Sequence, residues 1–223
     1  FNISVMITPD FWDYYKRNEK FPLVNPRNKK VVGYVDAKKL LSDIAYMAWK
    51  TGDPGVLFMD NGNKHNPQLE KRGYIRATNP CGEQYLYPYE SCNLGSINIY
   101  AFIKEDEEGN VYFDWEEFKE TIKLAYRFLD NVIDVNKYPI EQIDVASRRI
   151  RRVGLGMMGI ADAMYALAIP YNSEQGFEFI RKICEWLTYY SMLESVERAK
   201  QRGTFETFKD TFYVKGEMPV EGF

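Results

Sequence analysis

The spacing of apolar residues predicts a strand, a helix and an irregular segment at the start of the chain. Apolar side chains stand at positions 1, 3, 5 and 7, and this alternation predicts a strand that already includes the first residue. Thr8 followed by Pro9 favours the start of a helix that runs to about Lys16. Residues 18–35 contain two prolines and a basic cluster, which indicates an irregular or hairpin segment.

The next part of the chain continues the alternation of helices and strands. Asp36 predicts the N-cap of a helix that carries an apolar stripe and ends at Gly52. Residues 55–59 are a short apolar run between turn residues, which predicts a buried strand. A polar loop is expected over residues 60–67, and an alternating strand over residues 96–100.

Helical spacing dominates the second half. Asp114, with Glu117 three residues later, is a capping-box pattern and predicts a long helix to about Asn136. Two further helices are expected, one over residues 154–168 and one that starts at Asn172 or Ser173, runs to about Arg202 and is ended by Gly203. This order is typical of an α/β architecture with a helical elaboration.

Composition and charge narrow the class of protein. The chain has 223 residues, 45% of them hydrophobic, with 29 basic and 32 acidic side chains. These values fit an ordinary globular protein, and the acidic balance argues against a nucleic-acid partner. No apolar run is long enough to span a membrane, so no membrane partner is expected. Three cysteines in a chain of this length favour a reducing, cytoplasmic setting over a secreted disulfide framework.

The two ends of the chain suggest a piece of something longer. The sequence opens inside a predicted strand, and it stops at residues 219–223 without a closing element. We therefore expect a single segment of one domain. Strands and a loop would occupy residues 1–113, and a mainly helical part would occupy residues 114–223.

Two cysteines eleven residues apart lie in the most informative part of the sequence. Residues 79–84 read Asn-Pro-Cys-Gly-Glu-Gln, and residues 90–95 read Glu-Ser-Cys-Asn-Leu-Gly. In an extended segment Asn79, Cys81 and Glu83 would project to one side, because strand side chains repeat every second residue. A thiol between a hydrogen-bonding amide and a potential general base is typical of a reaction centre.

A plainer interpretation of Cys81 competes with this one. A lone cysteine is commonly a small buried hydrophobic residue. The polar and glycine neighbours of Cys81 do not suit a core position, and Pro80 with Gly82 indicates a tight loop whose backbone closely approaches another group. Local chemistry alone leaves both interpretations open.

These residues resemble a known family. Residues 79–84 and the later stretch 88–98 are similar to the finger loop and following strand of the ribonucleotide reductase catalytic subunit. The particular residues of these two motifs are most similar to those of the adenosylcobalamin-dependent class II enzymes. Further matches run from residues 1–5 to residues 152–159, so the resemblance covers essentially the whole chain. The fold that it implies is part of the ten-stranded α/β barrel of these enzymes.

The resemblance implies a role for each matching residue. Cys81 would carry the thiyl radical that removes the 3′ hydrogen of the substrate ribose. Glu83 would be the general base at the 3′ hydroxyl, and Asn79 would hydrogen-bond the ribose hydroxyls, so that both bind substrate. Cys92 would be one half of the redox-active pair, whose other half in the family lies upstream of the position matching Phe1.

The resemblance also implies cofactor and partners for the complete enzyme. The cofactor would be adenosylcobalamin, and the substrates would be ribonucleoside di- or triphosphates. The expected partners are a thioredoxin- or glutaredoxin-type reductant, nucleotide effectors and possibly a second copy in a homodimer. The enzyme would be under allosteric control, and its deoxyribonucleotide products would be used in DNA replication. The effector loops and the phosphate loop have no counterpart here, so the flanking segments of the same enzyme are also expected partners, and the isolated chain is expected to be inactive.

Other notable residues favour structural interpretations. Cys184 shares an apolar helical stripe with Ile183 and Leu187, which predicts a core position. Residues 154–159 satisfy the G-x-G-x-x-G pattern, but a charged run precedes them, so a dinucleotide site is rejected. The family resemblance implies a helix-start packing element at this position instead. The basic run over residues 148–152 could contact phosphates, although a solvated or interface face is expected. A single histidine argues against a protein-held metal.

Two alternative functions remain at this stage. The chain could be a non-catalytic segment of a split or intein-interrupted reductase, useful only after joining to its flanks. It could instead be a stand-alone dithiol redox module that uses Cys81 and Cys92 directly. The second alternative is disfavoured because such modules have close C-x-x-C spacing at a helix N-terminus.

Overall fold

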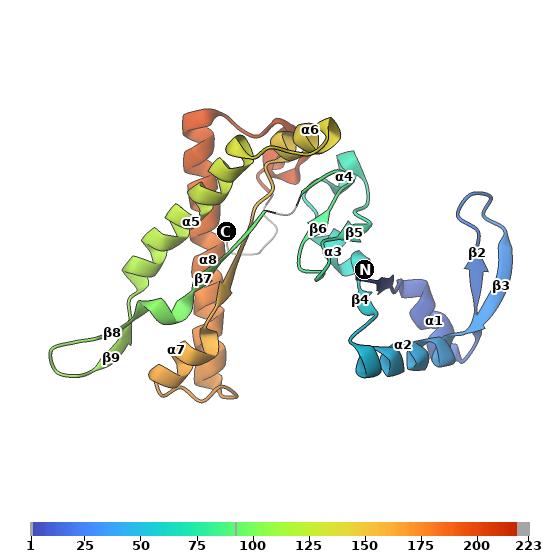
Figure 1. Ribbon diagram of the computed structural model, residues 1–223, viewed down its shortest axis with the longest axis horizontal. Coiled ribbons are helices and arrows are strands. Elements are labelled where there is room, and N and C mark those ends of the chain that lie inside the picture. Colours follow the sequence, from blue (N-terminus) through green and yellow to red (C-terminus); the bar gives the residue numbers. More distant parts are fainter. Residues whose placement is uncertain (1, 92, 218–223) are drawn as a thin grey trace. The chain divides into compact units, whose positions relative to one another are not determined.

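The computed structural model describes residues 2–91 and 93–217, and these form two compact units. Of these residues, the first unit comprises 2–88 with 210–212, and the second comprises 89–91, 93–209 and 213–217. Helices and strands alternate in both, which confirms a mixed α/β composition (Figure 1). The strands of the described residues form five separate two-stranded pairs, of which two are parallel and three antiparallel.

The first unit begins with a strand and two helices whose ends match the sequence signals. Its elements up to the second helix are β1 (Ser4–Met6), α1 (Pro9–Arg17), β2 (Lys20–Val24), β3 (Val31–Asp36) and α2 (Ala37–Thr51). The Asp36 side chain accepts a hydrogen bond from the Lys39 amide at 2.7 Å, and Gly52 ends α2 in the left-handed conformation. The segment predicted as irregular or a hairpin is the antiparallel hairpin β2–β3.

Two expectations for the remainder of this unit were wrong. The structure has β4 (Gly55–Leu57), α3 (Met59–Lys64), α4 (Leu69–Arg72), β5 (Ala77–Thr78) and β6 (Tyr85–Leu86). β4 pairs in parallel with β1, but its residues are exposed or half-buried, because among the described strands only β1 pairs with it. The predicted polar loop is largely the helix α3, and it is not solvated throughout, because Asn63 and Asn66 are buried.

The second unit is built on a parallel strand pair. Its first elements are β7 (Leu94–Asn98), a 3-10 turn (Ile99–Phe102), and the hairpin strands β8 (Ile103–Glu105) and β9 (Val111–Phe113). β10 (Gly154–Met158) pairs with β7 over five residues, from Gly154 beside Leu94 to Met158 beside Asn98. The single helix predicted for residues 154–168 was therefore wrong. A strand comes first, and Gly159 then turns in the left-handed conformation into α7 (Ile160–Ala166).

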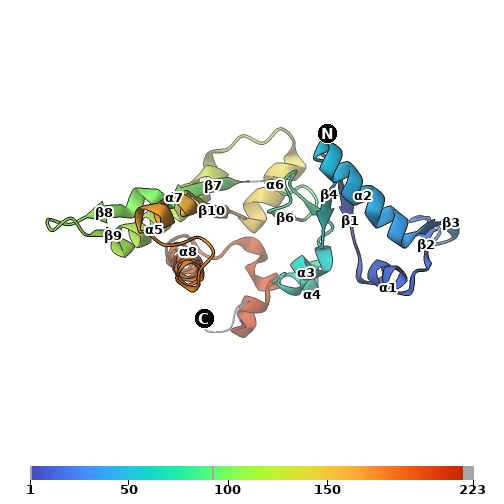
Figure 2. The ribbon, with the colours of Figure 1, turned by 90° about the horizontal axis from the view of Figure 1, so that it is seen from below.

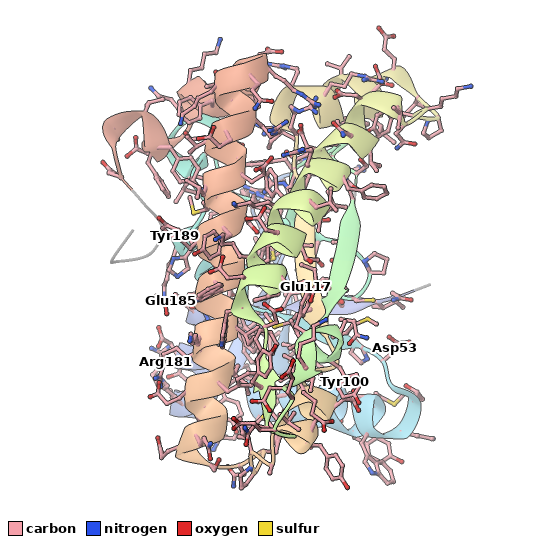
Figure 3. All side chains as sticks on the ribbon, turned by 90° about the vertical axis from the view of Figure 1, so that its left-hand side faces the viewer. Asp53, Tyr100, Glu117, Arg181, Glu185 and Tyr189 are labelled. Carbon is pink, nitrogen blue, oxygen red and sulfur yellow. The ribbon has the colours of Figure 1, made fainter. Side chains whose placement is uncertain are left out.

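Long helices cover this strand pair. They are α5 (Trp115–Val135) and α8 (Glu174–Arg202), with the shorter α6 (Glu141–Ile150) between them in sequence. Asp114 caps α5 and Ser173 caps α8, as the sequence predicts. α5 and α8 pack against each other, as Figures 2 and 3 show. The core between the helices and strands is aliphatic and aromatic: Ile97, Ile99, Phe102, Phe113, Phe118, Ile122, Ala163, Met164, Phe179, Ile183 and Leu187.

The expected core position of Cys184 was wrong. The thiol is free and exposed, although Ile183 and Leu187 on the same helix are buried. The buried stripe of α8 continues from Phe179 to Ile183, so Cys184 falls just outside it. Arg181, Glu185 and Tyr189 mark the outward face of the helix in Figure 3.

The arginines of the basic run over residues 148–152 form ion pairs within the second unit. Arg148 pairs with Asp144 at 2.8 Å and Arg149 with Glu206 at 2.7 Å. Arg151, which ends α6 in the left-handed conformation, contacts Asp130 and Asp134 of α5, and Arg152 contacts Glu90. These arginines therefore tie α6 to its surroundings while Arg148 and Arg149 stay exposed, so the expected solvated face is confirmed for these two, and no phosphate site is needed to explain the run.

Replacing Arg152 by methionine should destabilise the protein by about 3 kcal/mol, because the Glu90 side chain is only 1% exposed and would lose a charged partner. Urea unfolding of the variant measures this change. The matched control is Arg181→Met, whose partner Glu178 is 66% exposed, so that the loss there should be at most about 1 kcal/mol. Equal effects of the two substitutions would contradict this account.

The Arg151–Asp134 pair should make stability depend on acidic pH. The hydrogen bond and charge of Arg151 lower the pKa of Asp134 below its ordinary value of 3.8. The ion pair therefore stabilises the folded protein fully above pH 4. This stabilisation is lost as the pH falls through the lowered pKa of Asp134 in the folded state. Asp134→Asn should reduce the unfolding free energy at pH 7, and the difference from the parent protein should shrink below pH 3. A constant difference would show that the charge is not responsible.

Candidate active-site loop

The loop between β5 and β6 carries the residues that the sequence analysis selected. Ala77 pairs with Leu86 and Thr78 with Tyr85, so residues 79–84 form the connection of a short antiparallel hairpin. The main-chain amide of Gly82 donates to the carbonyl of Asn79 at 3.1 Å, which closes a turn with Pro80 and Cys81 at its centre. Cys81 is free and exposed. The structure thus favours an accessible thiol over a buried one.

Asn79 closes the base of this loop. Its main-chain amide donates to the carbonyl of Gln84 at 3.1 Å, and its side-chain oxygen accepts from the amide of Gln84 at 2.9 Å. Its side-chain nitrogen donates to the Glu83 carboxylate. Asn79 and Glu83 are therefore brought together as predicted, but a turn does this. The extended segment expected from the two-residue spacing was wrong.

Gly82 is needed for the turn on two counts. Its φ of +85° is in the left-handed region that side-chain-bearing residues rarely adopt. A Cβ at this position would also lie 3.2 Å from the side chain of Leu57 in β4. The close backbone approach expected for this loop is confirmed.

A buried network of amide side chains supports the hairpin from behind. Asn63 donates to the carbonyls of Met59 and Ile75 and accepts from the Ile75 amide, at 2.8–2.9 Å. Asn66 donates to Asn63 and, at 2.8 Å, to the hydroxyl of Tyr87, one residue beyond β6. The network therefore connects α3 to the strand that leaves the loop. Sequence analysis missed it, although three asparagines in a short segment before a cysteine motif were a signal.

Tyr74 adds a polar contact at the edge of this support. Its hydroxyl donates to the carboxylate of Asp60 in α3. Desolvation, together with this hydrogen bond to a negative charge, raises the pKa of Tyr74 to about 12. The tyrosine therefore stays neutral and keeps donating at physiological pH.

Cys92 lies outside the described residues, but the residues on either side of it are well anchored. Ser91 and Ser147 of α6 share a hydrogen bond of 3.0 Å between their hydroxyls. The Asn93 side chain donates to the carbonyl of Leu129 in α5 at 2.8 Å, and the Asn93 carbonyl accepts from Gly154. This second cysteine segment is thus held by α5, α6 and the start of β10.

Other candidate sites in the described residues do not involve these groups. A cavity of about 700 Å³ lies in the second unit among residues of α5, α8 and the segment after α8, and the described site residues Asn79, Cys81 and Glu83 do not line it. No group of three or more His, Cys, Asp or Glu side chains that could hold a metal occurs in the part of the chain that the structure describes. No helix within that part is long and apolar enough to cross a membrane.

Comparison with known proteins decides the family. The family described as "Ribonucleotide reductase, barrel domain" matches residues 1–223. The chain belongs to this family. It is 44% identical over 205 residues to the vitamin B12-dependent ribonucleoside-diphosphate reductase of Thermoplasma acidophilum, and 41% identical over 215 residues to that of Mycobacterium tuberculosis. It is also 39% identical over 197 residues to the ribonucleoside-diphosphate reductase subunit alpha of Chlamydia pneumoniae.

These matches cover most of this chain but a minor part of each relative. They span 92%, 96% and 86% of the chain, and 26%, 30% and 18% of the three reductases, respectively. The chain thus corresponds to less than a third of the length of these relatives. The resemblance to the ribonucleotide reductase catalytic subunit, seen in the cysteine motifs, is confirmed at the level of the family.

The contact between Tyr85 in β6 and Gly62 in α3 can be tested as a support of the loop over residues 79–84. Gly62→Ala should displace the ring of Tyr85 in β6, because a Cβ at Gly62 would overlap that ring. We expect a loss of about 1–3 kcal/mol in the unfolding free energy, as for other overpacked sites. Gly33→Ala, where the nearest side-chain atom is 3.8 Å away, is the control. A neutral Gly62→Ala variant would show that this contact does not position the hairpin.

Proposed function

We propose that this chain is the catalytic-loop segment of an adenosylcobalamin-dependent ribonucleotide reductase, which converts ribonucleotides to deoxyribonucleotides. The single observation that carries the proposal is the loop over residues 79–84. It exposes a free thiol at Cys81 and joins Asn79 to Glu83 by a hydrogen bond. Family membership and the names of the relatives supply the reaction class. The isolated chain corresponds to less than a third of those enzymes, so the activity is assigned to the complete protein.

Cys81 begins and ends the proposed reaction. Its thiyl radical takes the hydrogen atom from C3′ of the ribose, which leaves a carbon radical on the sugar and a thiol on Cys81. Glu83 accepts the proton of the 3′ hydroxyl, which helps the 2′ hydroxyl to depart as water. At the end the C3′ radical takes the hydrogen atom back, and the Cys81 radical is restored.

A dithiol supplies the reducing equivalents. Cys92 and a partner thiol outside this chain together give two electrons and two protons, and they become a disulfide. The balance is one ribonucleotide and two thiols giving one deoxyribonucleotide, one disulfide and one water. A thioredoxin- or glutaredoxin-type protein would then reduce the disulfide again by thiol exchange.

Asn79 and Glu83 are proposed to bind the ribose hydroxyls. Glu83 is exposed, whereas Asn79 is buried at the base of the loop. The turn holds both groups close to Cys81 along the chain, so a local rearrangement of the loop is enough to place all three groups at the ribose. The loop therefore contributes positioning as well as chemistry.

The exposed thiol of Cys81 fits the cofactor that the relatives' names imply. Adenosylcobalamin, when bound, supplies an organic radical able to remove the hydrogen of a thiol, and it brings its own cobalt. A radical source of this kind needs a thiol that is accessible and not held in a disulfide, and Cys81 meets both conditions. Cys81 is the residue of this chain that would face the cofactor.

In the complete enzyme, Cys81→Ser should lower turnover by at least about a thousandfold, because a hydroxyl cannot replace the thiol as a radical carrier. Nucleotide binding should stay within a few-fold of the parent enzyme. Deoxyribonucleotide formation and equilibrium binding of the substrate nucleotide are the two measurements. Cys184→Ser is the matched control, since that thiol is also free and exposed but lies on α8, and it should leave turnover unchanged. An active Cys81→Ser enzyme would rule out the radical role.

A further inference from the structure

The side chain of Gln84 is the most unusual buried group near the candidate site. Gln84 is 7% exposed, and neither its side-chain nitrogen nor its side-chain oxygen has a hydrogen-bond partner among the described residues. An amide buried without partners is unfavourable, and native structures contain few of them. Its main-chain groups, in contrast, are both bonded to Asn79.

The neighbouring residues of the loop are paired with one another. Asn79 uses its side-chain oxygen on the amide of Gln84 and its side-chain nitrogen on Glu83. Asn79 is also only 8% exposed, so if Asn79 and Glu83 are to bind a ribose, as proposed above, the base of the loop has to open and give up some of these bonds. The described loop is therefore in a self-paired arrangement, and substrate binding requires its base to rearrange.

We propose that Gln84 is a positioning residue, whose amide becomes hydrogen-bonded only when the loop rearranges around a bound ribonucleotide. The side chain has both a donor and an acceptor, so it can bond peptide groups of the loop that the rearrangement frees. The unpaired amide disfavours the self-paired loop, and its pairing favours the substrate-bound loop. The equilibrium shifts because the two states differ in the bonds they offer Gln84.

Other buried amides of the same unit do not share this property. Gln68 is 2% exposed, but its side-chain oxygen accepts from Arg72 at 2.9 Å. Asn63 and Asn66 bond to the groups described above. Gln68 therefore provides a control of the same residue type, in the same unit and also buried, but with a partner in the resting structure.

The test compares Gln84→Met with Gln68→Met, because methionine keeps the length of the side chain and removes both polar atoms. Without nucleotide, Gln84→Met should leave the melting temperature unchanged or raise it, since an unpaired amide is removed. Gln68→Met should lower it. A fall with Gln84→Met as large as that with Gln68→Met would overturn the proposal, because it would show that the amide is already paired.

The second measurement follows the loop itself in the complete protein. The rate at which iodoacetamide alkylates Cys81 is determined by peptide mass spectrometry, with and without CDP or CTP. Nucleotide should change this rate in the parent protein, and the change should be much smaller in Gln84→Met at saturating nucleotide. An unaltered rate in the parent protein, or an equal change in both proteins, would overturn the proposal.

Turnover separates this inference from the proposed function on which it rests. Gln84→Met should lower kcat by about tenfold to a hundredfold, as expected for a misplaced reacting group, with a smaller change in KM. Gln68→Met should leave kcat of the folded enzyme unchanged. An inactive parent enzyme would reject the reductase assignment, whereas an active parent with an equally active Gln84→Met variant would reject only the role of Gln84.

Discussion

The hydrogen bonds of Asn79 are the interaction on which the candidate site depends. One residue closes the base of the loop through its main chain, holds the amide of Gln84 through its side-chain oxygen and bonds to Glu83 through its side-chain nitrogen. With Gly82 in the left-handed conformation, this arrangement leaves Cys81 exposed at the turn. The residue proposed to bind the ribose is thus also the residue that shapes the loop.

Polar side chains as well as apolar packing hold the cysteine segments in place. Behind the first cysteine, Asn63 and Asn66 link α3 to the end of the hairpin. On either side of the second, Ser91 and Asn93 bond to helices α6 and α5. Hydrogen bonds have defined directions, so such networks specify one arrangement more strictly than aliphatic contacts do. This suits a site whose reacting groups need fixed relative positions.

The sequence predicted the starts of several helices correctly, but it did not predict most of the strand pairs. The caps Asp36, Asp114 and Ser173 act within three residues, and the helices that they start were predicted correctly. β10 was missed because its partner β7 lies about sixty residues earlier, and no local pattern reports such a pairing. The short runs that make up β5 and β6 carry no periodicity at all.

The sequence by itself determined the family, through the residues around Cys81 and Cys92, and it determined where the helices capped by Asp36, Asp114 and Ser173 begin, because both signals are local. The tertiary structure decided which side chains are buried and what they bond. It placed Cys184 outside the core, paired the arginines of residues 148–152 with acids, and left the amide of Gln84 buried beside the loop. Burial and hydrogen bonding depend on residues far apart in sequence, so spacing alone could not supply them.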